Sequence, residues 1–147
     1  MRQKCLALMM GALALCLPRS GATQQAAAPL KDGVFVHVSH GYDDPHRTLM
    51  ALSMAAMMSD DHDVLVYFDV KAVDVVLKDA RDLTYAHFPS AQTQIQKLRD
   101  KGVVLMACPG CLKAAGKTGG DLAPGVTLAD KAKFFSFTKG RILSLDY

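Results

Sequence analysis

Apolar runs alternate with amphipathic segments along most of the chain. The short runs are rich in valine and leucine, which is typical of strands buried on both faces of a sheet. They predict strands over residues 33–38, 63–68, 103–107, 126–128 and 141–146. Segments with a helical spacing of apolar residues predict helices over residues 45–58, 70–78, 91–101, 109–115 and 129–138. This alternation predicts a three-layer α/β domain with a flavodoxin-like parallel sheet of about five strands.

Capping residues support two of these helices. Asp44 stands where an N-cap is expected, and Pro45 occupies the first helical position, where its missing N–H costs nothing. Ser90 is a second candidate N-cap, and Gly102 is the stop of the same helix. The helices over 45–58 and 91–101 therefore have defined ends in the sequence alone.

The N-terminal segment has the three-part pattern of a secretory signal peptide. Residues 1–4 are basic, residues 5–17 are apolar, and small residues follow Pro18 as far as Ala22. The apolar run is shorter than the roughly 20 residues that cross a bilayer. We therefore predict a signal peptide over residues 1–22, a flexible leader over 23–32, and one domain over 33–147. The mature protein is expected to be periplasmic or secreted, without a membrane anchor.

Removal of the predicted signal changes both the charge and the cysteine count. The formal net charge is +3, and residues 1–22 hold three basic residues and no acidic one, so the mature chain is formally neutral. We therefore expect no nucleic-acid partner, because such partners require basic surfaces. Two of the four cysteines leave with the signal, and the other two form the motif Cys108-Pro-Gly-Cys111. One pair is too few for a disulfide-stapled fold, so we expect the pair to carry chemistry.

The CPGC motif stands where a predicted strand becomes a helix. The free amides and dipole of a helix start favour an anion, so we expect a lowered pKa for Cys108 and a nucleophilic thiolate. Gly110 allows a substrate to approach the backbone, and Cys111 is within disulfide reach of Cys108. A thioredoxin is disfavoured, because the motif comes late in the chain and no Trp is present. An inert structural disulfide is the alternative for the pair.

A second polar loop is expected at the same edge of the sheet. In open parallel sheets, ligands bind beyond the carboxyl ends of the strands. His40 and Tyr42 follow the first predicted strand, and we assign them to substrate binding. This loop faces the CPGC motif if the first and third strands are central neighbours.

A metal site is the alternative use of the thiols. Cys108 and Cys111 with His37, His40 or His46 would make a four-ligand site, but a single CxxC pair is a weak metal signal. The sequence has no nucleotide-binding loop and no GxSxG nucleophile motif. We therefore expect no resident cofactor.

Three segments carry a resemblance to a known family. They are VFVHVSHGYDDPHR at 34–47, VVLMACPGCLKAAG at 103–116 and GVTLADKAKFFSFTKGRILSLDY at 125–147. The chain resembles the DsrE/DsrF-like family, which includes the TusD-like sulfur-relay proteins. The resemblance implies that Cys108, eight residues before Gly116, carries a persulfide. Cys111 departs from the simplest members, and we expect it to act as a resolving thiol.

The resemblance also implies partners. It implies a protein that donates or accepts sulfur and a homo-oligomer, most simply a trimer or a multiple of it. The apolar helix over 45–58 agrees with assembly, because it carries Met50, Met54, Met57 and Met58. The sequence is compatible with a sulfurtransferase-like protein or a thiol-disulfide redox protein. The alternatives are the metal-binding module and a scaffold subunit for a sulfur-metabolism partner.

Overall fold

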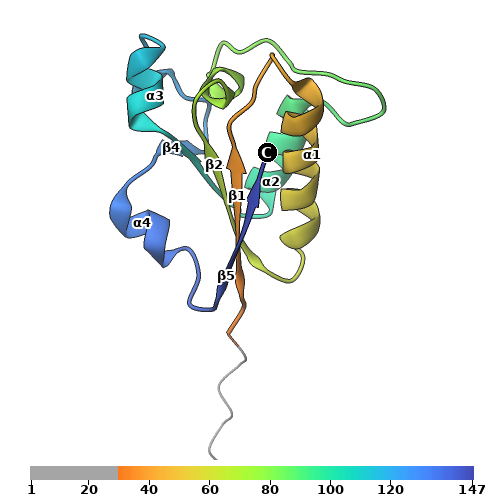
Figure 1. Ribbon diagram of the computed structural model, residues 1–147, viewed down its shortest axis with the longest axis vertical. Coiled ribbons are helices and arrows are strands. Elements are labelled where there is room, and N and C mark those ends of the chain that lie inside the picture. The colour runs from red at the N-terminus through yellow and green to blue at the C-terminus, as the bar shows by residue number, and fades with distance from the viewer. Residues whose placement is uncertain (1–29) are drawn as a thin grey trace, which may run out of the picture.

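The computed structural model describes residues 30–147 as one α/β domain (Figure 1). The predicted signal peptide and most of the predicted leader lie outside the described residues. Five parallel strands form one sheet in the order β4-β3-β2-β1-β5. Their bounds are Gly33–Val38 (β1), Asp63–Phe68 (β2), Val104–Ala107 (β3), Val126–Leu128 (β4) and Ile142–Asp146 (β5). The predicted α/β fold with about five parallel strands is confirmed.

Four α-helices and two short 3₁₀ turns connect the strands. The helices are Pro45–Met58 (α1), Ala91–Asp100 (α2), Pro109–Ala114 (α3) and Lys131–Ser136 (α4), and the turns are Ala72–Val76 (η1) and Gly119–Asp121 (η2). The caps are as predicted, since Asp44 accepts the Arg47 N–H at 3.1 Å and Ser90 accepts the Thr93 N–H at 3.4 Å. None of the helices within residues 30–147 is both long and apolar enough to span a bilayer.

Two predicted helices are shorter in the structure, because residues near their predicted C-terminal ends make tertiary contacts in place of helical ones. The segment predicted as helix 70–78 forms only η1, since Leu77 becomes extended and bridges to Leu122. The helix predicted over 129–138 is limited to α4. Its last predicted residue, Thr138, is buried and donates its hydroxyl hydrogen bond to the Lys31 carbonyl at 3.0 Å.

The strand order differs from the arrangement that would make β1 and β3 neighbours. β2 lies between them, paired with both, so the condition under which their loops would face each other directly is not met. β5 instead returns to the free side of β1, where the Gly33 N–H bonds to the Arg141 carbonyl at 2.6 Å. β2, β3 and β4 therefore extend the sheet on one side of β1, and β5 is added on the other side. The segment after β2 lies between the loop that follows β1 and the CPGC motif that follows β3.

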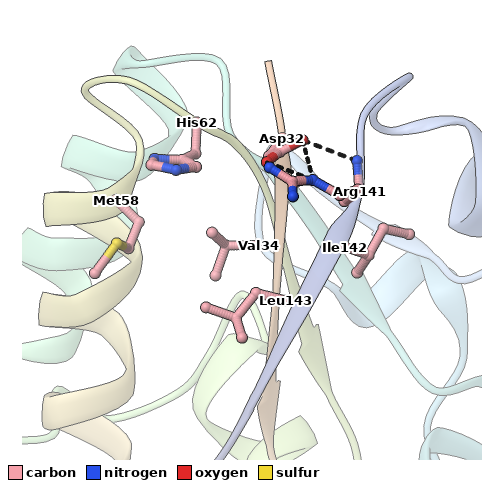
Figure 2. Close-up of a pocket in the computed structure, with 8 residues that line it drawn as sticks. Asp32, Val34, Met58, His62, Arg141, Ile142 and Leu143 are labelled. Carbon is pink, nitrogen blue, oxygen red and sulfur yellow. Dashed lines mark hydrogen bonds and ion pairs between the residues drawn. The ribbon is translucent and has the colours of Figure 1, made fainter. Parts of the chain in front are cut away.

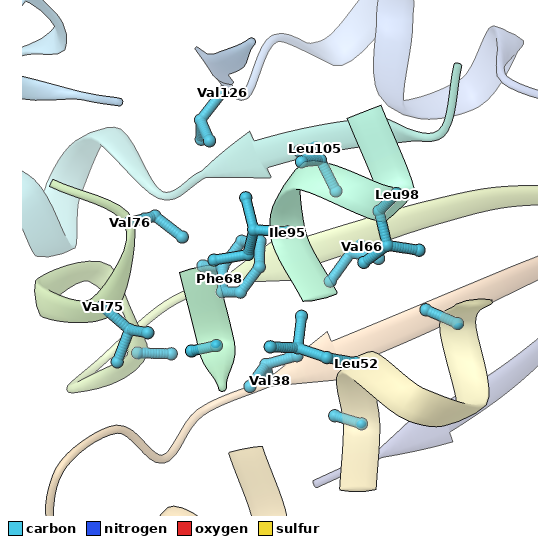
Figure 3. Packing of buried hydrophobic residues seen from close by; sticks show 14 of the residues in the cluster. Val38, Leu52, Val66, Phe68, Val75, Val76, Ile95, Leu98, Leu105 and Val126 are labelled. Atoms are coloured by element: carbon cyan, nitrogen blue, oxygen red, sulfur yellow. The ribbon is translucent and has the colours of Figure 1, made fainter. Parts of the chain in front are cut away.

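The two longer helices cover one face of the sheet. Figure 1 shows α1 and α2 on this side, and Figure 3 shows the side chains that fill the space beneath them. Phe68, Leu52, Leu98 and Val66 are fully buried there. Burial of this apolar surface is the main driving force for the fold.

A smaller helix covers part of the other face. Phe134 of α4 packs against Phe35 and Tyr67, with ring centroids 5.1 and 5.4 Å apart. Side chains alternate between the faces of a strand, so His37 shares this face with Phe35. The layer opposite α1 and α2 is therefore partly aromatic.

The loops that follow β1 and β2 are held together at the carboxyl end of the sheet. The Lys71 N–H donates to the Ser39 carbonyl at 3.2 Å, and the Lys71 ammonium is 3.2 Å from an Asp43 carboxylate oxygen. Gly41 is buried in this contact, where an added Cβ would lie 2.5 Å from the Lys71 carbonyl oxygen. A side chain at position 41 would therefore force the loops apart.

We predict that Gly41→Ala destabilises the fold by about 1–3 kcal/mol, because backbone must move to accept the methyl group. Gly120→Ala is the matched control, since the nearest atom to its added Cβ is the Thr118 hydroxyl oxygen at 3.6 Å. It should change the free energy of unfolding by about 0.5 kcal/mol or less. Urea unfolding measures both values, and equal stabilities of the two variants would contradict the tight contact.

Candidate functional site

Cys108 lies where β3 gives way to α3. Its N–H donates to the Phe68 carbonyl at 2.9 Å, which ties it to the end of β2. Cys108 is the N-cap of α3, and its sulfur accepts the Cys111 N–H at 3.2 Å. Pro109 at the first helical position is compatible with this turn. In the part of the chain that the structure describes, Cys108 and Cys111 are free, half-buried thiols.

The surroundings of Cys108 favour its thiolate. Burial opposes the charge, but hydrogen bonds from the Cys111 thiol, the Tyr67 hydroxyl and the amides of Cys111 and Gly110 lower the pKa of Cys108. Donors that point at a sulfur stabilise its negative form. The sequence prediction of a lowered pKa for Cys108 agrees with this direction, and Gly110 contributes through its amide.

Tyr67 is a site residue that the sequence analysis did not identify. Tyr67 lies on β2 and pairs with Met106 of β3, which is two residues before Cys108. Because side chains alternate between the faces of a strand, Tyr67 and Cys108 both point to the face covered by α4. Contacts with Phe35 and Phe134 hold its ring. Burial and the hydrogen bond to Cys108 raise the pKa of Tyr67, so its hydroxyl remains a donor.

The pKa of Cys111 shifts in the opposite direction from that of Cys108. Burial, the hydrogen bond of its thiol to Cys108, and the charges of Cys108 and Asp69 raise the pKa of Cys111. The Val70 N–H opposes this shift by donating to the sulfur. The pKa values of the two neighbouring thiols therefore shift in opposite directions, as is expected of a nucleophile next to a resolving cysteine.

Val70 has an unusual backbone. Its φ of 45° lies in the left-handed region, which is unfavourable for a β-branched residue, and its side chain is exposed. Val70 is two residues after Phe68, whose carbonyl accepts the Cys108 N–H. Strained residues of this kind often occur at functional sites, and here the strain lies next to the thiol pair.

A histidine between two carboxylates lies on the same face of the sheet, next to Tyr67. His37 Nδ1 is 2.9 Å from an Asp146 oxygen, and His37 Nε2 is 2.9 Å from Asp69 Oδ2. The Nε2 contact is an ion pair whose alignment falls outside that of a hydrogen bond. Burial lowers the pKa of His37, but the two carboxylates outweigh it and the net shift is upward. The cluster of His37, Asp69 and Asp146 brings together β1, the end of β2 and β5.

The residues assigned to substrate binding have partners of their own. His40 Nδ1 is 3.0 Å from an Asp43 oxygen, and the Tyr42 hydroxyl donates to the Arg81 carbonyl at 2.5 Å. The Arg81 guanidinium lies 4.4 Å above the Tyr42 ring. His40 is linked to the segment after β2 because Lys71 contacts the same Asp43 oxygen. A role of His40 and Tyr42 in substrate binding stays a prediction.

The alternative metal site is not assembled in residues 30–147. No group of three or more His, Cys, Asp or Glu side chains there is arranged to hold a metal ion. The aromatic neighbours of His46 are Tyr85 and Phe88. The His37 contacts are with carboxylates, so neither histidine joins the thiol pair as a metal ligand within the described structure.

A separate hollow of about 310 Å³ lies at the opposite end of the sheet (Figure 2). Asp32 pairs with Arg141 on one side of it, and Val34, Met58 and Leu143 line its apolar part. These residues stand at or near the starts of β1 and β5 and the end of α1. The hollow is therefore remote from the thiols, which lie at the carboxyl ends of the strands.

Comparison with known proteins places this fold. The DsrE/DsrF-like family matches residues 32–138. The protein MTH1491 of Methanobacterium thermoautotrophicum, described as of unknown function, is 22% identical, with a TM-score of 0.57 over 78% of this chain and 99% of its own. The ychN protein of E. coli is 15% identical, with a TM-score of 0.54 over 80% of this chain and 100% of its own. At these identities, the two structures show a shared fold.

No curated protein sequence matches the chain. The family match nevertheless covers nearly all of the described domain, including β1, the CPGC motif and α4. The chain belongs to the DsrE/DsrF-like family.

Proposed function

We propose that the chain is an exported thiol protein that takes up sulfane sulfur on Cys108 and passes it on with Cys111 as the resolving thiol. Membership of a family that includes sulfur-relay proteins supports a role of this class. The observation that carries the proposal is the different environment of the two sulfurs. Cys108 Sγ accepts hydrogen bonds at the start of α3, which lower the pKa of Cys108, whereas the pKa of Cys111 is raised.

The proposed loading step transfers one sulfur atom. The Cys108 thiolate attacks the terminal sulfur of a polysulfide or of a partner's persulfide, forming an S–S bond to Cys108. The S–S bond of the donor breaks, and its electron pair leaves with the shortened donor. The Tyr67 hydroxyl and the amides around Cys108 stabilise the attacking thiolate. The loaded sulfur then passes to an acceptor thiolate, or Cys111 displaces it as sulfide and a Cys108–Cys111 disulfide remains.

Export is the part of the proposal that rests on sequence alone. Residues 1–22 have the basic, apolar and small-residue order of a signal peptide. An oxidising compartment outside the cytoplasm would give the dithiol a place to cycle. N-terminal sequencing of protein recovered from the cell envelope would start near Thr23 if this is right, whereas an intact Met1 would argue against it.

We also propose that copies of the chain assemble through the edge of the sheet at β5. β5 is an edge strand, and Leu143, which pairs with Val34 and lines the hollow near the end of α1, is more than half exposed on it. The hollow in Figure 2 joins Leu143 to Met58 at the end of α1. Met57 of the same helix is 57% exposed, so the methionine-rich helix presents apolar surface to solvent. Exposed apolar edges commonly mark interfaces.

The roles of the two cysteines are tested by loading reduced protein with inorganic polysulfide and measuring intact mass. Cys111→Ser should retain one added sulfur atom, because no second thiol displaces it. Cys108→Ser should retain none. Wild-type protein should pass through the adduct to a form that has lost two hydrogens, while sulfide is released. Sulfur retained by Cys108→Ser, or a bound metal in the purified protein, would contradict the assignment.

The hydrogen bond from Tyr67 predicts a specific pH effect. Tyr67→Phe removes a donor to the thiolate, so alkylation of Cys108 by iodoacetamide at mildly acidic pH should slow by roughly three- to tenfold. The rates of wild type and variant should converge at alkaline pH, where Cys108 is ionised in both. Tyr85→Phe is the control, since Tyr85 is exposed and packs against His46. An unchanged pH dependence in Tyr67→Phe would remove Tyr67 from the site.

Light scattering of the wild-type protein should give a particle of several chains, a trimer or a multiple of it. Leu143→Glu places a charge on the proposed interface and should yield single chains. Ser144→Glu is the control on the same exposed strand, because its side chain points to the other face of the sheet. A wild-type protein that remains a single chain at micromolar concentration would refute the assembly.

A further inference from the structure

We propose that Asp69 is the proton acceptor that activates Cys111 when this thiol attacks the loaded Cys108. This inference rests on the proposed function, because it concerns the step in which Cys111 resolves the adduct. It assigns a role to a half-buried carboxylate that the loading step does not use.

The backbone places Asp69 next to the start of α3. Its N–H donates to the Val38 carbonyl at 3.0 Å, and the preceding carbonyl, that of Phe68, accepts the Cys108 N–H at 2.9 Å. Asp69 therefore directly follows the residue that contacts Cys108, and Cys108 is the N-cap of the helix that carries Cys111. Because side chains alternate along a strand, Asp69 turns to the same face as Tyr67.

One carboxylate oxygen of Asp69 contacts His37, and the other has no hydrogen-bond partner among residues 30–147. Oδ2 is 2.9 Å from His37 Nε2. Oδ1 is buried and has no hydrogen-bond donor among residues 30–147. A buried carboxylate oxygen without a donor is unfavourable, and the arrangement is explained if this oxygen accepts a proton during the reaction. The charge of Asp69 also contributes to the raised pKa of Cys111.

Resolution requires such an acceptor, because the attacking species must be a thiolate. The Cys111 proton passes to Asp69, and a bond forms between the Cys111 and Cys108 sulfurs. The bond between Cys108 Sγ and its added sulfur breaks, and the electron pair leaves with that sulfur. The departing sulfide takes the proton from Asp69 and leaves as HS⁻. The two cysteines are oxidised to a disulfide, the sulfane sulfur is reduced, and Asp69 is again a carboxylate.

The other ionisable groups around Asp69 have different positions. His37 faces it from β1, Tyr67 precedes it on β2, and the two cysteines face it from the start of α3. Asp146 of β5 contacts His37 through Nδ1, the nitrogen on the other side of the ring from Asp69. Its side chain is 69% exposed, against 19% for Asp69. Asp146 is therefore a matched control, a carboxylate on the same histidine but with no place beside the thiols.

The test separates attack by Cys108 from resolution by Cys111. Reduced protein is mixed with one equivalent of dithiobisnitrobenzoate, which releases a coloured thiolate when Cys108 attacks and a second one when Cys111 resolves the mixed disulfide. Asp69→Asn should leave the first phase unchanged and slow the second by roughly 10²-fold at mildly acidic pH. The loss should shrink as pH rises, because hydroxide then removes the Cys111 proton. Asp146→Asn should keep a second phase close to that of wild type.

Three results would overturn the inference. They are an unchanged second phase in Asp69→Asn, an equal loss in Asp146→Asn, and a loss that does not vary with pH. Should Asp69→Asn fail to fold, Asp69→Glu decides the question. It keeps the charge but moves the carboxylate, so its second phase should also slow, and an unchanged rate would refute the role.

A parallel experiment with inorganic polysulfide keeps this inference distinct from the proposed function. If polysulfide loads Cys108 but Asp69→Asn releases sulfide as fast as wild type, the role of Asp69 is refuted while sulfur uptake stands. If polysulfide never loads Cys108 but the second phase depends on Asp69, sulfur uptake is refuted. Asp69 then serves disulfide formation in a thiol-disulfide redox protein.

Discussion

The hydrogen bond from the Cys108 amide to the Phe68 carbonyl fixes the relation between the two halves of the site. It continues the pairing of β2 with β3 beyond the last residue of β3. Residues from one short stretch at the end of β2, Tyr67, Asp69 and Val70, thereby reach the thiols. Phe68 is fully buried under α1 and α2, so the hydrophobic core holds this stretch in place. The chemistry at the sheet edge therefore depends on the central position of β2.

Two neighbouring thiols acquire opposite properties from the direction of the groups around them. Burial raises the pKa of both thiols, but hydrogen bonds from the amides at the start of α3 and from the Tyr67 hydroxyl lower that of Cys108, whereas two negative charges raise that of Cys111 further. Both sulfurs are partly shielded from water, which strengthens these local effects. The unfavourable backbone of Val70 is retained in this setting, and its N–H limits the upward shift in the pKa of Cys111. Well-packed neighbouring strands can offset such strain.

The fold separates the thiol chemistry from the apolar surface. The cysteines, His37 and Asp69 lie toward the carboxyl ends of the strands, and the hollow beside Leu143 lies at the opposite end. A partner could therefore approach Cys108 while another copy covers β5. The family and the shared fold do not by themselves define the reaction, because one fold supports many functions. The second cysteine and the half-buried carboxylate are the features that distinguish a resolving mechanism from simple sulfur carriage.

The sequence by itself determined the elements and the position of the thiol motif. Strand and helix patterns, the caps Asp44 and Ser90, and a cysteine at a helix start are local features that a short window contains. Tertiary structure alone decided the strand order and the contacts of Tyr67, His37 and Asp69. Tyr67 and His37 lie within apolar segments that predict buried strands. The only sign of their place in the site is a polar group within an otherwise apolar strand. Their roles depend on pairing between strands far apart in sequence, such as His37 with Asp146, and local propensity carries no information about which strands become neighbours.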